Sequence, residues 1–394
     1  MSETDTMDFI RHIKGNVSLV TWNALANVLG RLWSSLLSLL SIPIYIHILG
    51  AEAFGLIGFF STFDIIFNFL DFGLSATVNR EIARNVTTGA DPQKNKVVLR
   101  TFESLYWVMG AAIGLVMFSS AGWLTRHWIH IKSLPPGDVQ TALTIISFAF
   151  FARWPVSLYT GVLRGLQAQV LQNLILVVSS TVRVVGGIAI IIFVFPTIHG
   201  YALWYAFAAF LEILLISLTA WNRLNRLTGA AASFDWSVFK NTWNFAFTFN
   251  LVGVIGMVVS SADRVVISKL LPLDQLGYYS IAGTATGIMP LISIALMTAL
   301  FPRFVGQLTQ DGQTLFLSFR ESVGFLSYVS AGLTFVLIFY AREILWIWTR
   351  SDITVTNVYQ PLIFLAIANM LNAISNAPYT LLVANGQTRA LLVG

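Results

Sequence analysis

Long apolar segments recur along the whole chain, and they constrain its fold more than any other feature of the sequence. A hydrocarbon core of about 30 Å requires ~20 helical residues, and each segment meets that length. The ~10-residue alternating segments of a membrane barrel do not occur, so the sequence predicts an all-α polytopic membrane protein. Ten complete spans are expected, and an eleventh begins near Arg389; the ten cover residues 17–47, 55–79, 99–124, 139–160, 170–195, 201–221, 242–268, 277–301, 321–346 and 358–384.

The composition also indicates that lipid, and not water, surrounds most of the protein surface. Of the 394 residues 56% are hydrophobic and only 10% are charged, whereas soluble domains carry ~25% charged residues. The net charge of +5 comes from cations in short loops between spans, so it indicates membrane orientation and no nucleic-acid partner. The chain has no cysteine, which excludes thiolate metal sites and thiol nucleophiles. With no extramembrane stretch longer than about two dozen residues, we expect no enzyme activity, no metal and no cofactor.

Lysine and arginine are distributed unequally between the two sides of the predicted membrane. Loops on the side of the N-terminus carry 14 of them and the opposite loops carry 5. Because cytoplasmic loops are enriched in these residues, the N-terminus is predicted to be cytoplasmic. Tryptophans near helix ends on the outer side form the expected interfacial belt: Trp128, Trp204, Trp346 and Trp348.

Two short patterns recur with nearly the same spacing. Residues 49–55 (LGAEAFG) return as residues 271–277 (LPLDQLG), 222 positions later, and Tyr159-Thr160 followed by Gln167 returns 220 positions later as Tyr379-Thr380 followed by Gln387. Both first helices leave the cytoplasm, so the spacing predicts parallel repeats related by an axis along the membrane normal. The expected division is a cytoplasmic segment 1–16, a first lobe 17–222, a cytoplasmic linker 223–241 and a second lobe 242–394. A second lobe of equal length would end near residue 441, so we expect its last ~50 residues to be missing.

Ionised side chains fall within or at the edge of the predicted spans. A charge at the bilayer centre costs ~2.5–3.5 kcal/mol on insertion scales, so such residues usually face water or a partner. Polar residues spaced by three and four positions along the first, second and seventh spans predict an aqueous lumen between the lobes. The charged residues are Arg31, Arg153, Arg183, Arg264, Asp64, Asp71, Glu103, Glu212, Asp263 and Glu321, and the neutral lining is predicted to include Asn23, Asn27, Asn68 and Ser260.

The arginines have two interpretations. A series of guanidinium groups across the membrane suits an anionic passenger, because arginine forks onto phosphate oxygens and stays charged; on this reading Arg31, Arg153, Arg183 and Arg264 bind it. Alternatively each arginine pairs with an acid to join helices, with Asp64 or Asp71 as the partner of Arg31. Asp64, Asp71 and Asp263 are in turn candidates for proton or sodium coupling or for structural pairing. A kink is predicted at Trp154-Pro155.

Four stretches resemble the Wzx-like or RfbX-like polysaccharide-repeat flippases, a branch of the multidrug/oligosaccharidyl-lipid/polysaccharide (MOP) exporter superfamily. They are Ile42-Pro43-Ile44-Tyr45 before Leu49-Gly50; Leu70-Asp71-Phe72-Gly73-Leu74-Ser75 before Asn79-Arg80; Gly161-Val162-Leu163-Arg164-Gly165-Leu166-Gln167; and Ala262-Asp263-Arg264 followed by Leu276-Gly277-Tyr278-Tyr279.

This resemblance implies a MATE-like V-shaped bundle of two six-helix lobes in the bacterial cytoplasmic membrane. Its implied substrate is an undecaprenyl-pyrophosphate-linked oligosaccharide, a repeat unit of O-antigen, capsule or exopolysaccharide, moved from the inner to the outer leaflet by alternating access. Membrane lipid, a polysaccharide polymerase and glycosyltransferases are the implied partners. Cationic lumen residues are thought to hold the pyrophosphate in this family.

Two other functions predict different residues from those present. A proton- or sodium-coupled exporter of small molecules on the same fold should have a lumen dominated by acids, whereas this one contains four arginines. A membrane-embedded glycosyl polymerase should carry a long catalytic outer loop, and the longest outer loop here has about 14 residues. Both features favour a flippase of an anionic substrate.

Overall fold

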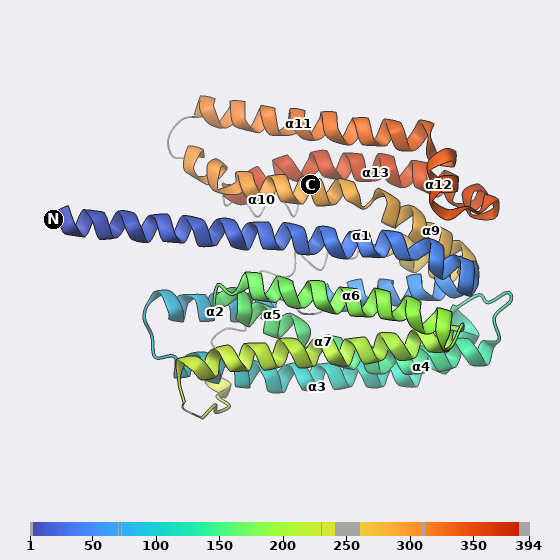
Figure 1. Cartoon of the computed structure of the whole chain (residues 1–394), viewed down its shortest axis with the longest axis horizontal. Helices are drawn as coiled ribbons and strands as arrows, with labels where there is room; N and C mark the ends of the chain where they lie inside the picture. The colour runs from blue at the N-terminus through green and yellow to red at the C-terminus, as the bar shows by residue number, and fades with distance from the viewer. Residues whose placement is uncertain are drawn as a thin grey trace. The chain divides into compact units, whose positions relative to one another are not determined.

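The structure is a computed structural model, and it describes residues 3–69, 71, 73–229, 231–240, 261–308 and 312–385 (Figure 1). Eight helical segments among these residues are long and apolar enough to cross a membrane, so the prediction of an all-α polytopic protein is confirmed. The helices are α1 (Glu3–Phe69), α2 (Leu74–Thr87), α3 (Gln93–Trp123), η1 (Leu124–Trp128), α4 (Pro136–Arg153), α5 (Val156–Gly165), α6 (Gln169–Phe193), α7 (Ile198–Leu227), α9 (Leu273–Thr286), α10 (Ile288–Leu308), α11 (Gly312–Phe339), α12 (Ala341–Thr349) and α13 (Asp352–Ala384).

Most expected spans correspond to helices of the structure. Segments 99–124, 170–195, 201–221 and 358–384 lie within or close to α3, α6, α7 and α13. The predicted kink is confirmed, since α4 ends at Arg153 and α5 begins at Val156; Pro155 has no amide hydrogen to continue the helix. Of segment 242–268 only residues 261–268 are described, and these are helical. The segment starting at Arg389 lies outside the described residues.

Three expectations about single helices are wrong in part. Segments 17–47 and 55–79 lie on the two sides of a break within α1 at Gly50 (φ 83°, ψ 165°), but the second helix ends at Phe69 and not at residue 79. Gly73 adopts a left-handed φ of 64° before α2, a conformation that costs glycine little. The side chain of Asp71 accepts a hydrogen bond from the Ser75 amide at 3.2 Å, so it offers the start of α2 a partner outside the helix. Likewise segment 277–301 is interrupted at Gly287 and segment 321–346 at Tyr340.

The chain forms two compact units. Unit 1 comprises Met1–Ser41, Phe60–Ile129 and Leu134–Val265, and unit 2 comprises Ile42–Phe59, His130–Ser133 and Val266–Gly394. The lobe boundaries expected from the sequence stay a prediction.

In unit 1, α4 packs against α3 and α7, α6 packs against α7, and α2 packs against α5 (Figure 1). Two glycines of α5 explain its contact with α2. A Cβ added at Gly161 would lie 2.5 Å from the carbonyl oxygen of Ser75, and a Cβ added at Gly165 would lie 2.8 Å from that of Asn79. The Gly-x-x-x-Gly pattern therefore lets α5 approach the backbone of α2 closely.

In unit 2, the two repeated segments contact each other. A Cβ at Gly55 would lie 1.9 Å from the carbonyl oxygen of Leu273, and a Cβ at Gly277 would lie 2.6 Å from that of Ala51. Positions 51 and 273, like 55 and 277, are 222 residues apart. The contact is thus reciprocal, as in an interface across a two-fold axis. The helices α9, α10 and α11 of this unit all pack against α13.

Residues 130–133, here called the strap, join η1 to α4 but belong to unit 2. The carboxylate of Glu52, which is 7% exposed, accepts hydrogen bonds from the amides of Lys132 (2.5 Å) and Ser133 (2.8 Å) and from the Ser133 hydroxyl. The Lys132 ammonium pairs with Asp274 at 2.9 Å. Glu52 and Asp274 are themselves 222 positions apart, so equivalent acids of the two repeats hold the same short segment.

Candidate functional site

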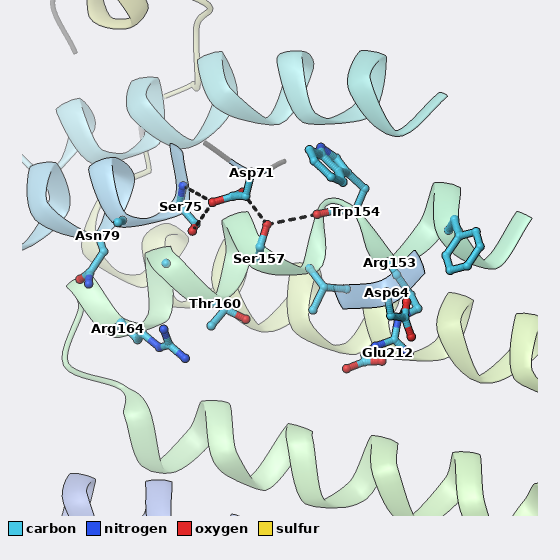
Figure 2. Close-up of a pocket in the computed structure, with 14 residues that line it drawn as sticks. Asp64, Asp71, Ser75, Asn79, Arg153, Trp154, Ser157, Thr160, Arg164 and Glu212 are labelled. Atoms are coloured by element: carbon cyan, nitrogen blue, oxygen red, sulfur yellow. Dashed lines mark hydrogen bonds and ion pairs between the residues drawn. The ribbon is translucent and has the colours of Figure 1, made fainter. Parts of the chain in front are cut away.

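A cavity of about 350 Å³ lies within unit 1, lined by the last part of α1 and by α2, α4, α5 and α7. Figure 2 shows Asp71, Ser75 and Ser157 joined by hydrogen bonds in its wall, with Arg164 on one side and Arg153, Asp64 and Glu212 on the other. Three of the predicted lumen residues, Asp64, Asp71 and Arg153, therefore share one cavity. The polar and charged lining residues are Asp64, Asp71, Ser75, Asn79, Arg153, Ser157, Thr160, Arg164 and Glu212.

Asp71 is a buried carboxylate, 6% exposed, whose described partners are all neutral. One oxygen accepts hydrogen bonds from the amide (3.2 Å) and hydroxyl (2.6 Å) of Ser75, and the other from the hydroxyls of Ser157 (2.9 Å) and Tyr106. Such donors offset the cost of burying the charge. Among the described residues no cation pairs with Asp71, so its charge is hydrogen-bonded but not neutralised.

Arg153 forms a compact network with one acid and one tyrosine from two other helices. Its Nε lies 3.4 Å from Oδ1 of Asp64, and its Nη1 donates to the hydroxyl oxygen of Tyr205 at 2.9 Å. The Tyr205 hydroxyl donates in turn to Oδ2 of Asp64 at 2.5 Å. The network joins α1, α4 and α7, and it compensates the charge of Arg153 within unit 1.

Arg183 is compensated in a similar way, because its Nη1 lies 3.3 Å from Oε2 of Glu212 and thereby joins α6 to α7. The helix-joining interpretation thus holds for Arg153 and Arg183. The expected pairing of Arg31 with Asp64 or Asp71 is wrong: Asp64 is bound by residues of α4 and α7, and Asp71 by hydroxyls and the start of α2.

Arg31 and Arg164 differ from Arg153 and Arg183. Arg31 has an exposed side chain on α1, and Arg164 lies in the last turn of α5, within the range at which the two positive charges repel each other. The Nε of Arg164 donates to Oε1 of Gln172 at 3.2 Å. In the described part of the chain neither guanidinium forms an ion pair with a carboxylate. Two neighbouring like charges without a counter-ion favour an anion between or beside them.

The predicted lining residues Asn23 and Asn27 lie on α1 near this pair, and both bond across to the α5–α6 region. Asn27 donates to Oε1 of Gln169 at 3.0 Å and accepts from Asn173 at 2.6 Å, while Asn23 donates to the Gln167 carbonyl oxygen at 3.4 Å. Among the described residues, the buried Oδ1 of Asn23 has no hydrogen-bond partner. These amides hold α1 against α6.

The remaining predicted site residues are not brought to this cavity by the described structure. Arg264 is half-buried in the helical residues 261–270 and does not line it, and its backbone amide bonds the side chain of Asp263 at 2.8 Å. The Asn68 side chain and all of Ser260 lie outside the described residues. Sequence reasoning missed Arg164, because this residue follows an apolar run and was counted among the loop cations. Its place inside the Gly161–Gln167 pattern was the available signal.

Comparisons with known proteins add a family and a fold. Residues 20–306 match the polysaccharide biosynthesis protein family. A Shigella flexneri protein that carries the name of an O-antigen transporter is 22% identical over 374 residues, which cover 93% of this chain and 85% of that protein.

Solved structures with a similar fold include two conformations of a multidrug resistance MATE family transporter of the MOP superfamily. The inward-facing one gives a TM-score of 0.69 at 15% identity and covers 89% of this chain and 83% of that chain. The outward-facing one gives 0.64 at 15% identity and covers 95% and 84%. At this identity the likeness concerns the fold alone.

Proposed function

The chain belongs to the polysaccharide biosynthesis protein family, and from this premise we propose that it is a multi-pass membrane transporter of the MOP type that flips a lipid-linked oligosaccharide. The passenger is an undecaprenyl-pyrophosphate-linked repeat unit, carried from the inner to the outer leaflet of the bacterial cytoplasmic membrane. Its polar head would otherwise cross hydrocarbon without hydrogen-bonding partners. Glycosyltransferases would act on the same glycan before it is flipped, and a polymerase would act on it afterwards.

The uncompensated pair Arg31 and Arg164 is the observation that supports this function most. A pyrophosphate carries several acceptor oxygens, and guanidinium groups bind such oxygens in a forked geometry. Arg153 and Arg183 already face acids at 3.4 and 3.3 Å, so we assign them to joining helices. The pyrophosphate site therefore rests on two arginines, with Ser75, Asn79 and Thr160 of the adjoining cavity offering hydrogen bonds to sugar hydroxyls.

Asp71 is the ion-coupling candidate in this proposal. A buried carboxylate held only by neutral donors can take up a proton or a sodium ion without displacing a cationic partner. Asp64 is less suited, because Arg153 and Tyr205 already occupy its oxygens.

The test is transport of a fluorescent lipid-linked oligosaccharide in proteoliposomes, scored by its accessibility at the opposite leaflet. We expect Arg31→Gln/Arg164→Gln to reduce the rate at least tenfold, because both guanidinium contacts to phosphate are removed. Arg226→Gln, an exposed cation at the end of α7, is the matched control and should leave the rate unchanged. Transport by the double variant at the wild-type rate would exclude the arginine site.

A second candidate is a proton- or sodium-coupled exporter of small organic cations, which the three cavity acids Asp64, Asp71 and Glu212 favour. Efflux of such a cation driven by an ion gradient and abolished by Asp71→Asn, with no movement of the lipid-linked glycan, would support it instead.

A further inference from the structure

A groove of about 780 Å³ lies within unit 2 where α12 turns into α13. Its walls include Arg342, Glu343 and Trp346 of α12 and Asp352 and Tyr359 of α13. These positions recur at helical spacing, so each helix contributes one face. The apolar span that contains α13 begins at Asp352, which places the groove at the end of a membrane span.

Both arginines at this turn lie on aromatic rings. The guanidinium carbon of Arg342 is 4.7 Å from the ring centre of Tyr359, and that of Arg350 is 4.7 Å from the ring centre of Trp346. Cation–π contacts fix the position of the guanidinium plane and leave its N–H groups open to an acceptor. Within the described residues neither guanidinium forms an ion pair.

The acids of the groove are also uncompensated. Glu343 and Asp352 are exposed, and no hydrogen bond or ion pair to either carboxylate occurs in the part of the chain that the structure describes. Each lies in the first turn of its helix, where the N-terminal end of the helix dipole stabilises the ionised form. The groove thus presents two anionic groups and the cationic Arg342, with a second cation, Arg350, beside it at the end of α12, and these groups do not pair with one another within the described residues.

We propose that this groove binds the headgroup of a zwitterionic phospholipid that carries a primary amine. The phosphate meets the guanidinium groups of Arg342 and Arg350, and the ammonium donates hydrogen bonds to Glu343 and Asp352. A quaternary ammonium fits less well, because it requires open aromatic faces and guanidinium groups already cover the Tyr359 and Trp346 rings. The acyl chains follow Ile347 and Ile353, which are 63% and 70% exposed beside the groove. This site is independent of the glycan-flipping proposal.

The experiment is native mass spectrometry of the purified full chain, titrated with phosphatidylethanolamine, phosphatidylcholine and phosphatidylglycerol of identical acyl chains. We expect wild-type protein to retain the ethanolamine lipid about fivefold better than the choline lipid, as two partly exposed charge contacts allow. Glu343→Gln/Asp352→Asn should abolish this preference. Arg342→Gln should weaken retention of all three lipids, since each carries a phosphate.

The control is Asp138→Asn, which removes a half-buried acid from the first turn of another span, in α4, where its carboxylate lies 3.8 Å from His199 Nε2. It should leave the preference intact, and the thermal unfolding of each variant without added lipid shows that the fold is retained. Equal retention of the ethanolamine and choline lipids by wild type, or a preference that survives Glu343→Gln/Asp352→Asn, would overturn the proposal. So would a dimer that the groove variants dissociate, because the occupant would then be a second copy of the chain.

Discussion

Unit 1 joins some of its helices through ion pairs in addition to amides and close glycine contacts, whereas the described helices of unit 2 are joined to one another through hydroxyls, amides and close backbone contacts. In unit 1, Arg153 with Asp64 and Arg183 with Glu212 each connect different helices. In unit 2, the Ser293 hydroxyl donates to the Ala373 carbonyl oxygen at 2.9 Å, and the Asn369 amide donates to the Thr286 hydroxyl at 2.9 Å.

This difference has an energetic meaning. A charge held within a span costs several kcal/mol unless it is paired or hydrated, whereas neutral links between membrane helices contribute only ~0.6 kcal/mol each. Unit 2 is therefore held together by many weak neutral links and by glycine packing. Unit 1 keeps costly charges, and it is the unit in which the candidate site lies.

The glycine contact of unit 2 should give the largest effect. Gly55→Ala places a methyl group 1.9 Å from the Leu273 carbonyl oxygen, so the two helices must separate. We expect the free energy of unfolding to fall by about 3 kcal/mol, the upper part of the range for overpacking. Unfolding in mixed detergent micelles, followed by circular dichroism, measures it. Gly332→Ala is the control, because nothing lies within 4 Å of its added Cβ; there we expect a gain of ~0.5–1 kcal/mol. Equal effects at the two sites would contradict the close contact.

In unit 1, breaking the charge network should give an effect of similar or slightly smaller size. Asp64→Ala leaves Arg153 unpaired within a span, and removal of one partner of a buried pair costs ~3–5 kcal/mol. Because the side chains of Asp64 and Arg153 are 22% and 23% exposed, we expect the free energy of unfolding to fall by about 3 kcal/mol. The double variant Asp64→Ala/Arg153→Met should recover most of this loss in the same unfolding assay. A double variant as unstable as the single one would show that the ion pair is not the cause.

The strap is bound by a buried acid, Glu52, and by an exposed ion pair, Lys132 with Asp274, so the effects of the two contacts can be compared within one unit. Glu52→Gln replaces one of two acceptor oxygens that hold three donors, so we expect a loss of ~1–2 kcal/mol. Lys132→Met breaks only a contact in which the lysine side chain is 54% exposed, and should change stability by less than ~1 kcal/mol. Unfolding curves of the two variants side by side test the order, and a larger effect for Lys132→Met would reverse the interpretation of the strap.

The smallest effect should come from the neutral links of unit 2. Asn369→Leu removes a single amide-to-hydroxyl hydrogen bond to Thr286, and we expect a loss of ~0.6 kcal/mol. If this variant were as unstable as Asp64→Ala, the contrast between the two units would no longer hold.

The sequence predicted the features that depend only on residues close together in the chain. Apolar runs predict spans because helix length and bilayer thickness must match, and Pro155 predicts a kink because it lacks an amide hydrogen. The break at Asp71–Gly73 escaped prediction, since the polar periodicity continues across it and Asp71 is both a cavity residue and a partner of the α2 amides.

The pairing of charges could not be predicted for a different reason. Arg153 and Asp64 are 89 positions apart and lie on different helices. The sequence does not specify how these helices are rotated relative to each other, so the spacing carries no information on which of their faces meet. Arg164 illustrates the same limit, because its role depends on the approach of Arg31 from α1. The sequence predicts which face of each helix is polar, but only the folded structure shows which other helix that face meets.

The reciprocal contact of Gly55 and Gly277 also bears on the origin of the chain. A contact in which equivalent positions meet needs only one surface, so a half-length polypeptide with this surface could pair with a copy of itself. After a fusion of two such copies, each side would be free to change separately. Position 58 is glycine where position 280 is serine, and Glu52 now holds the strap amides while Asp274 holds the Lys132 ammonium. An ancestral homodimer would thus have become a single chain whose two faces evolve under different selection.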